Sequence, residues 1–270
     1  MHRRPSRREG AHHTGHRAEP PGLRHHVGVP DVVVTNAGYS DIVSIEDVDL
    51  ASLRAVVETN LWGGVHVVKA ALPVLREAGR GHFVQISSVT GRVAPAPGLG
   101  PYVTAKFAAE GFLEALAKEI AGFGIRVTIV EPGRMATSIV SSMAIPEPSA
   151  PYAGLIAPLA DTYASGASAE TDPAAAARFV LEVIGLDEPP LHPPLGGSAF
   201  QHILAAEQNR LAELAEWESF SRAAERPPGH PCAASSRCLL AAQSRSEFSA
   251  GSSAAPVGVS KYSTRGETCA

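Results

Sequence analysis

Cysteine and long apolar runs are scarce in this 270-residue chain, and each scarcity excludes a class of protein. The only cysteines, Cys232, Cys238 and Cys269, lie near the C-terminus, so we expect no disulfide framework in the core and a cytoplasmic protein. No apolar run reaches the roughly 18 residues that a membrane-spanning helix needs. The basic N-terminus is not followed by the apolar segment of a secretory signal. We therefore expect no membrane partner.

Concentrated positive charge is also missing from the periodic part of the chain. The net charge is −4, and 19% of the residues are charged. The basic residues form no stripe, and no aromatic residues alternate with them near the N-terminus, so we expect no nucleic-acid partner. With 44% hydrophobic residues, the composition is that of a globular protein.

Three regions differ in composition. Residues 1–30 are rich in Arg and His and show no helical or strand period, which predicts a disordered leader. Its histidines lack Cys or carboxylate partners at ligand spacing, so we predict no metal site. Residues 31–226 carry the periodic apolar pattern of a folded domain. Residues 227–270 are rich in Ser, Ala, Gly and Pro, which predicts a disordered tail.

Strand and helix patterns alternate within the folded part. The β-branched run that begins at Asp31 ends in a turn, and later apolar runs end at Ser87 and at Pro132. This order predicts βαβ units and a doubly wound parallel sheet with helices on both faces. The expected elements are strands at 31–35, 82–86 and 125–130, helices at 45–76, 102–121 and 172–184, an edge strand within 191–197 and a final helix at 198–224.

Regularity weakens between residues 134 and 168, where Pro, Ala, Ser and Met are common. Ligands of open α/β sheets bind beyond the carboxyl ends of the strands, which favours a substrate lid here. A plain surface excursion is the alternative, and the sequence does not separate the two.

Tyr102 and Lys106 are the strongest catalytic candidates. They are four residues apart, so they share one face of the expected helix. A neighbouring ammonium favours the phenolate, which predicts a lowered pKa for Tyr102 and suits an acid/base catalyst. Ser87 and Ser88 end the preceding strand. A hydroxyl at that strand end, facing the phenol, could polarise and protonate a carbonyl oxygen.

Asn60 is a polar residue within the apolar pattern of the first expected helix. A buried amide needs hydrogen-bond partners. Asn60 therefore either caps a local kink or holds an ordered water.

Five motifs in this order and spacing resemble the short-chain dehydrogenase/reductase family, over about residues 31–226. They are Asn36-Ala37-Gly38 after the first strand, Asn60 in the next helix, Ser88 after the following strand, Tyr102-x-x-x-Lys106, and Pro132-Gly133-x-x-x-Thr137. The resemblance implies a Rossmann-like α/β fold. It also implies an oxidoreductase that moves hydride between NAD or NADP and a small carbonyl or alcohol substrate.

The resemblance also implies roles for these residues. Tyr102 would be the general acid/base, Ser88 would orient the substrate oxygen, and Asn60 would hold a water in a proton relay. Ser87 is the rival to Ser88, whose separation from the tyrosine is nearer the family's. Lys106 would bond the nicotinamide ribose and lower the tyrosine pKa. The remaining cofactor contacts would be Asn36, Ala37 and Gly38 at the adenosine side, and Pro132, Gly133 and Thr137 at the nicotinamide end.

The Gly-rich phosphate-binding turn of the family has no counterpart in this sequence. Its place after a first strand is not filled, because Gly10, Gly15, Gly22 and Gly28 lack both the spacing and a preceding strand. We therefore expect a Rossmann-like sheet that is truncated at its N-terminal side. This departure also supports an alternative function, a non-catalytic scaffold that binds no dinucleotide.

Self-association is a further implication of the resemblance, through the helices expected at 45–76 and 102–121. Trp62, Val65 and Phe112 are apolar residues that a monomer would leave partly exposed. We expect a homo-oligomer.

Overall fold

A computed structural model describes residues 28–137, 139, 143–164 and 171–224. The predicted leader, apart from its last three residues, and the predicted tail lie outside this range, so both stay predictions. The chain divides into two compact units, residues 1–214 and 215–270. The fold and the site described below belong to the first unit.

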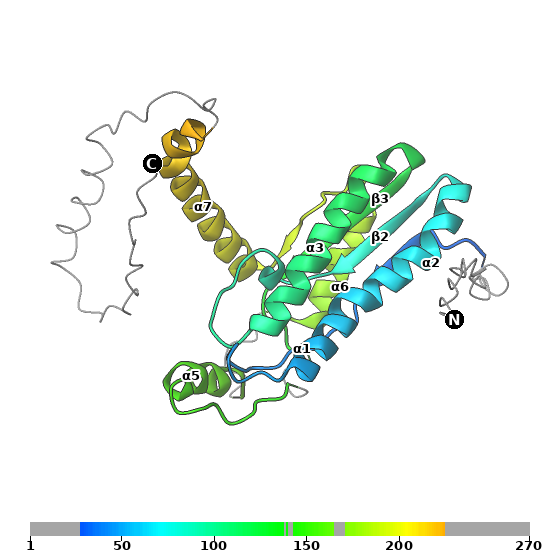
Figure 1. Cartoon of the computed structure of the whole chain (residues 1–270). Helices are drawn as coiled ribbons and strands as arrows, with labels where there is room; N and C mark the ends of the chain where they lie inside the picture. The colour runs from blue at the N-terminus through cyan, green and yellow to red at the C-terminus, as the bar shows by residue number, and fades with distance from the viewer. Residues whose placement is uncertain (1–27, 138, 140–142, 165–170, 225–270) are drawn as a thin grey trace, which may run out of the picture. The chain divides into compact units, whose positions relative to one another are not determined.

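A parallel sheet is the centre of this unit, with the strand order β1-β2-β3-β4 among the described residues (Figure 1). The strands are β1 (Val32–Thr35), β2 (Gly81–Ile86), β3 (Ile125–Pro132) and β4 (Pro194–Leu195). Val33 is in register with Phe83, and Phe83 with Val127. Consecutive parallel strands need crossovers, and helices supply them. The predicted parallel α/β sheet is confirmed.

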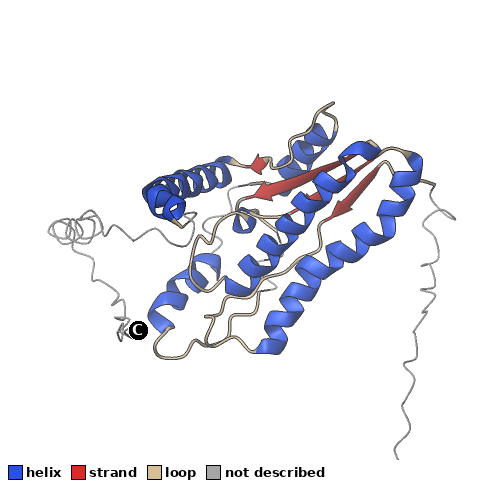
Figure 2. Cartoon of the chain, turned by 45° about the horizontal axis from the view of Figure 1, so that its top comes forward, coloured by secondary structure: helices blue, strands red, loops and turns tan. Residues whose placement is uncertain are grey.

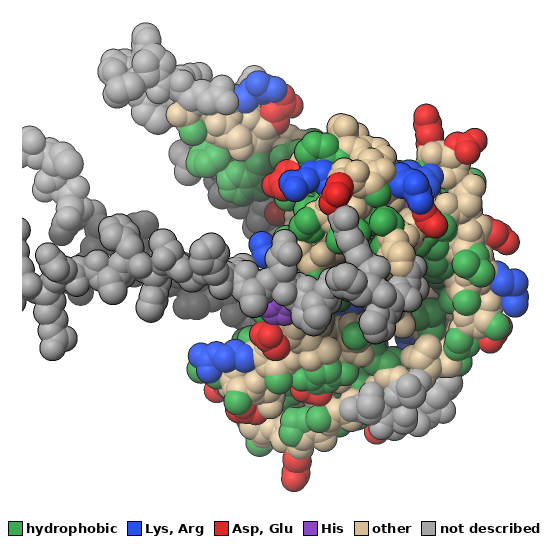
Figure 3. Space-filling view, turned by 90° about the vertical axis from the view of Figure 1, so that its right-hand side faces the viewer, with side chains coloured by type: hydrophobic (Ala, Val, Ile, Leu, Met, Phe, Trp, Pro, Cys, Tyr) green, Lys and Arg blue, Asp and Glu red, His purple; other side chains and the backbone are tan. Residues whose placement is uncertain are grey.

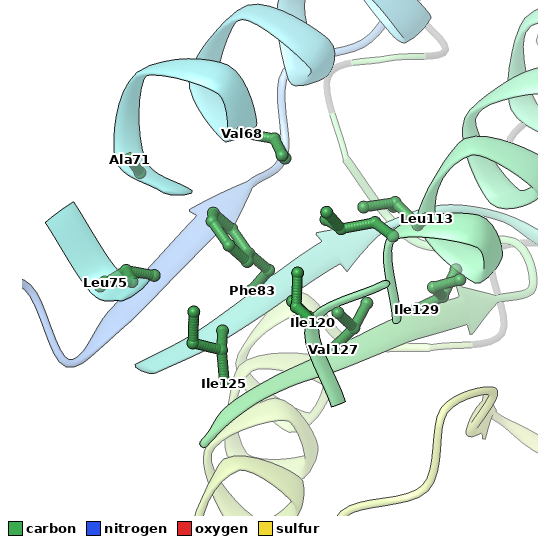
Figure 4. Packing of buried hydrophobic residues seen from close by; sticks show 10 residues of the cluster. Val68, Ala71, Leu75, Phe83, Leu113, Ile120, Ile125, Val127 and Ile129 are labelled. Atoms are coloured by element: carbon green, nitrogen blue, oxygen red, sulfur yellow. The ribbon is translucent and has the colours of Figure 1, made fainter. Parts of the chain in front are cut away.

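Helices cover both faces of the sheet (Figure 2). On one face lie α2 (Gly63–Ala78) and α3 (Gly100–Ile120), and α6 (Pro173–Ile184) lies on the other. The apolar core between α2, α3 and the sheet is built around Phe83 (Figure 4). Asp172 caps α6 by accepting a hydrogen bond from Ala175 N at 3.1 Å, which confirms the predicted helix start.

The single helix predicted over 45–76 is wrong in two respects. It begins later, as α1 (Leu50–Val57), because the Asp49 carboxylate accepts hydrogen bonds from Ala51 N and Ser52 N and so fixes the N-terminus there. It then passes through a π-helical turn, η2 (Glu58–Trp62), before α2. Such turns often mark functional sites, and this one contains Asn60.

The region predicted to be irregular, 134–168, contains a helix among its described residues. This is α5 (Ala153–Ala164), which includes Pro158. Ile156 packs against Ile42 and Leu99 in an apolar cluster, and burial of this kind stabilises a helix despite an internal proline. The segment is therefore anchored to the rest of the unit through α5.

Among the described residues the sheet ends at β1 on one side, and Val34 of this strand is 50% exposed. The final helix, α7 (Gly197–Ala223), begins close to the predicted position. In its part within the first unit, only Ala199 and Ile203 are buried. Across the described residues, no helix combines the length and apolar character needed to cross a membrane.

Candidate active site

A cavity of about 700 Å³ opens beyond the carboxyl ends of β2 and β3. Ligands of open α/β sheets bind at this position. Most of the residues predicted from the sequence line it together: Asn36, Gly38, Ser88, Tyr102, Lys106, Pro132, Gly133 and Thr137. Two predicted site residues do not line it. Ala37 is exposed, and Asn60 is buried behind Gly38.

Ser88 and Tyr102 meet in this cavity. Ser88 caps the short 3₁₀ helix η3 (Val89–Gly91), and its Oγ accepts a hydrogen bond from Thr90 N at 3.2 Å. The same hydroxyl is near enough to the Tyr102 phenol to lower the pKa of that phenol. Ser87, the rival candidate, instead donates its hydroxyl hydrogen bond to Glu110 at 2.5 Å. The geometry therefore favours Ser88 as the serine that acts with Tyr102.

Lys106 lies one turn of α3 from Tyr102, as predicted, with its Nζ 5.5 Å from the centre of the phenol ring. The ammonium donates a hydrogen bond to the carbonyl oxygen of Ile86 at 3.1 Å, which ties α3 to the end of β2. Burial lowers the pKa of Lys106 to about 8, although the nearby Glu110 raises it.

The pKa of Tyr102 departs from the prediction. The pKa is raised to about 12, mainly by burial and also by Tyr163, while Ser88 lowers it. We had predicted a lowered pKa from the Lys106 charge. The four-residue spacing correctly predicts that Tyr102 and Lys106 lie one helical turn apart. The spacing does not reveal how deeply the two groups are buried, and burial disfavours the charged form of each.

Asn60 occupies the π-helical turn and is buried. Its Nδ2 donates hydrogen bonds to Tyr39 O at 2.8 Å and to Val56 O at 2.9 Å. The side chain therefore binds backbone carbonyls at the point where the α-helical pattern changes, which supports the kink alternative. Its Oδ1 has no hydrogen-bond partner among the described residues. A Cβ at Gly38 would lie 2.5 Å from that Oδ1, so only glycine leaves room there.

Three site residues escaped the sequence interpretation. Arg134 follows the predicted Pro132-Gly133 motif, and its guanidinium lies 4.2 Å from the centre of the Tyr163 ring on α5. Both side chains line the cavity, as does His202 on α7. Their convergence depends on the fold of residues far apart in sequence, and no local motif signals it. Lys106 and Arg134 contribute positive charge, and no Asp or Glu is among the described residues that line the cavity.

The fold and the cavity together define an α/β protein with a Ser–Tyr–Lys site at the carboxyl ends of its parallel strands. Residues 22–147 match the family model described as short chain dehydrogenase. Oxidoreductase BOA17 of Botryotinia fuckeliana is 40% identical over 195 residues, which are 72% of this chain and 71% of that protein. The chain therefore belongs to the short-chain dehydrogenase family, and it is an enzyme of the dehydrogenase/reductase type.

Two further comparisons agree. The uncharacterized oxidoreductase C162.03 of Schizosaccharomyces pombe is 34% identical over 192 residues, covering 69% of this chain and 65% of that protein. The crystal structure of a short-chain dehydrogenase from Streptomyces avermitilis is 34% identical with a TM-score of 0.67. That match covers 72% of this chain and 71% of the other. The chain thus spans about two thirds of the length of these relatives.

Proposed function

We propose that this protein is an NAD(P)-dependent oxidoreductase that interconverts a small carbonyl compound and its alcohol. The observation that carries the proposal is the convergence of Ser88, Tyr102 and Lys106 in the lining of one cavity. The cytoplasmic location expected from the cysteine pattern is part of the same proposal.

In this proposal, Tyr102 donates its phenolic proton to the substrate oxygen during reduction and accepts it back during oxidation. Ser88 orients that oxygen through its hydroxyl. Lys106, whose pKa is about 8, is protonated near neutral pH and stabilises the phenolate that forms when Tyr102 gives up its proton. Asn60 presents a buried Oδ1 without a partner among the described residues, which suits the proposed water of a proton relay.

The cavity fits a nicotinamide dinucleotide in three respects. Its volume of about 700 Å³ lies within the range of cofactor sites. Its charged residues are cationic, which suits an anionic cofactor. Gly38 and Gly133 line it without side chains that would narrow it. The cofactor would supply the hydride when bound. Its contacts would be Asn36 and Gly38 on one side, and Tyr102, Lys106, Pro132, Gly133 and Thr137 on the other, whereas the predicted contact Ala37 does not line the cavity.

Titration of the full chain with NADH and NADPH, followed by cofactor fluorescence, tests the binding step. We expect saturable binding of at least one of them, weakened in Lys106→Met. Lys118→Met is the matched control, because Lys118 is an exposed lysine on the same helix and should leave binding unchanged. Oxidation of the bound cofactor by a panel of aldehydes and ketones then tests the chemistry.

The scaffold alternative predicts a different outcome of the same titration. It is favoured by one observation, that β1 ends the sheet among the described residues where the family's Gly-rich segment would pair. If neither cofactor binds at millimolar concentration to the folded chain, the scaffold alternative replaces the proposed activity.

Self-association is proposed through the face that carries η2, α2 and α3. Trp62, Val67 and Phe107 on these elements are 46%, 41% and 39% exposed, whereas Val65, predicted to be exposed, is buried. Figure 3 shows hydrophobic side chains among charged ones on the surface. We expect a multimeric mass in light scattering that Trp62→Glu with Phe107→Glu reduces. Leu155→Glu on α5, 56% exposed, is the control, and a monomeric mass of the unchanged chain would contradict the proposal.

A further inference from the structure

Glu110 is a buried acid that the proposed reaction does not use directly. It lies on α3 one turn beyond Lys106, so Tyr102, Lys106 and Glu110 follow each other at four-residue spacing. Glu110 is 2% exposed. Its Oε1 accepts a hydrogen bond from Ser87 Oγ at 2.5 Å, and its Oε2 has no hydrogen-bond partner among the described residues. A buried acid rarely persists without a structural or functional role.

The turn from Ser87 to Gly91 is shaped around this carboxyl group. A Cβ at Gly91 would overlap the Glu110 carboxyl group and lie 2.8 Å from Ser87 Oγ. The backbone therefore approaches Glu110 as closely as glycine allows. Ser88, which lines the cavity with Tyr102, lies within this same turn. Movement of Ser87 would consequently move Ser88 relative to the phenol.

We propose that Glu110 is a positioning residue of the active site, which holds Ser88 in place through Ser87 and keeps Lys106 protonated through its charge. The assignment rests on the proposed function only in that Ser88, Tyr102 and Lys106 act on the substrate. Glu110 itself does not line the cavity.

Charged groups from several elements face Glu110. Glu131 on β3 accepts hydrogen bonds through Oε1 from Arg92 at 3.1 Å, and from His192 Nδ1 at 2.8 Å when that nitrogen is protonated. Arg92 also pairs with Glu207 of α7, and His192 lies 3.3 Å from the Glu114 carboxylate. The pKa of Glu110 is raised to about 7, mainly by burial and also by Glu131, while Ser87, His192 and Arg92 lower it.

A bound cation is the competing interpretation of this cluster. Ligand atoms of Glu110, Glu131 and His192 lie within 4.8 Å of one another. However, the Arg92 guanidinium already provides positive charge beside Glu131, and His192 already contacts the same carboxylate oxygen. The arrangement therefore resembles a hydrogen-bonded charge cluster more closely than a cation site.

The proposal has a consequence for the titration of Lys106. Glu110 ionises as the pH rises through about 7, and its negative charge then favours the protonated form of Lys106, whose own pKa is about 8. Glu110→Gln keeps a hydrogen-bond acceptor for Ser87 but removes the charge. The pKa of Lys106 should therefore fall in this variant, because burial is no longer opposed by an anion.

NMR of the lysine side chains tests this coupling without any turnover. The sequence contains four lysines, so the Lys106 signal can be assigned by its loss in Lys106→Met. We expect its titration midpoint to fall by about half a pH unit or more in Glu110→Gln. Glu119→Gln removes an exposed acid from the same helix and should leave the midpoint unchanged. An unchanged midpoint in Glu110→Gln would overturn the electrostatic part of the proposal, whatever the reaction.

Turnover of a carbonyl compound from the panel tests the positioning part. We expect Ser87→Ala to lower kcat about tenfold with little change in KM, because the serine hydroxyl opposite Tyr102 is displaced while the cavity remains. Glu110→Ala should cause a loss of similar size, and the double variant should be no slower than the slower single variant. Fully additive losses would overturn the proposal.

The alkaline limb of the pH–rate profile supplies the remaining readout. It should move to lower pH in Glu110→Gln and stay in place in Ser87→Ala, which retains the acid. A limb that stays in place in both variants would contradict the coupling to Lys106. Loss of activity with EDTA, reversed by Mn²⁺, would overturn the assignment in favour of the cation site.

Discussion

The two halves of α3 place different kinds of residue on one continuous face. The first half carries Tyr102, Lys106 and Glu110 beside the cavity and the Ser87–Gly91 turn. The second half carries Leu113, Leu116 and Ile120, which pack on Phe83 and the sheet. The second half of the helix thus anchors it to the sheet, and the first half carries the candidate catalytic residues.

This difference separates the energetics of folding from those of catalysis. The apolar half contributes burial, which stabilises the fold in proportion to the area removed from water. The polar half buries ionisable groups, which costs free energy unless they are paired. The raised pKa of Tyr102 and the lowered pKa of Lys106 reflect this cost. Substitutions in the two halves should therefore have effects of different kinds.

Tyr102→Phe should abolish most of the activity and leave the fold unchanged. The ring remains in place while the proposed proton donor is lost, so we expect kcat to fall by about 10²–10⁴-fold. The free energy of unfolding should change by no more than about 1 kcal/mol, the net value of one hydrogen bond. Steady-state kinetics and urea unfolding measure the two quantities. A rate equal to that of the unchanged chain would remove Tyr102 from the mechanism.

Ile120→Ala should lower the stability of the fold and leave the activity of the folded molecules unchanged. Ile120 is 1% exposed, and truncation of such a core residue lowers the free energy of unfolding by about 2–5 kcal/mol. The activity per folded molecule should be retained, because the polar half of α3 is unchanged. Leu211→Ala on α7 is the control, since Leu211 is 65% exposed and its loss should change stability by only about 0.5 kcal/mol. Equal effects of the two substitutions would contradict the described core.

His82 extends the comparison to the other face of the sheet. It lies next to Phe83 on β2, so its side chain points to the opposite face, where Nε2 is 2.8 Å from Thr128 Oγ1. Burial and, to a smaller extent, the charge of Arg126 lower the pKa of His82 to about 4. The folded state therefore favours the neutral ring.

The sign of the resulting pH dependence follows from that lowered pKa. The contribution of His82 is fully present above its unfolded pKa of about 6.5, and is lost by up to about 1.4 kcal/mol per pH unit as the pH falls towards 4. Urea unfolding between about pH 7 and pH 5 should show this loss, with a smaller loss in His82→Gln. His66→Gln changes an exposed histidine and should behave like the unchanged chain.

Much of this architecture follows from local patterns. The β-branched run at Val32–Val34 and the Asp172-Pro173 helix start each depend on neighbours within a few residues, so both predictions were correct. The helix α5 was missed because Ile156 is stabilised by Ile42 and Leu99, which are distant in sequence. The π-helical turn was missed because it preserves an apolar pattern on both sides.

In the candidate site, too, some features follow from local patterns and others depend on the whole fold. The sequence placed Ser88, Tyr102 and Lys106 on the correct elements, because each follows a strand end or a helical spacing. Their pKa values could not be predicted, since burial is set by the whole fold. Glu110 also escaped notice, because a single acid on a helix normally faces solvent. The roles assigned to these residues stay predictions.

The π-helical turn at Glu58–Trp62 constrains how this region can change length in evolution. A π-helical turn can arise when one residue is added to an α-helix. Because the wider turn absorbs that added residue, removing one residue there would restore a regular α-helix and leave α2 facing nearly the same way relative to α1. Val65, Val68 and Leu75 would then stay in the core, but the Asn60 amide would lose the turn that brings it to its carbonyl partners. Insertions and deletions are usually confined to loops, but here the loss of a single residue inside a helix would alter the site and leave the core in place.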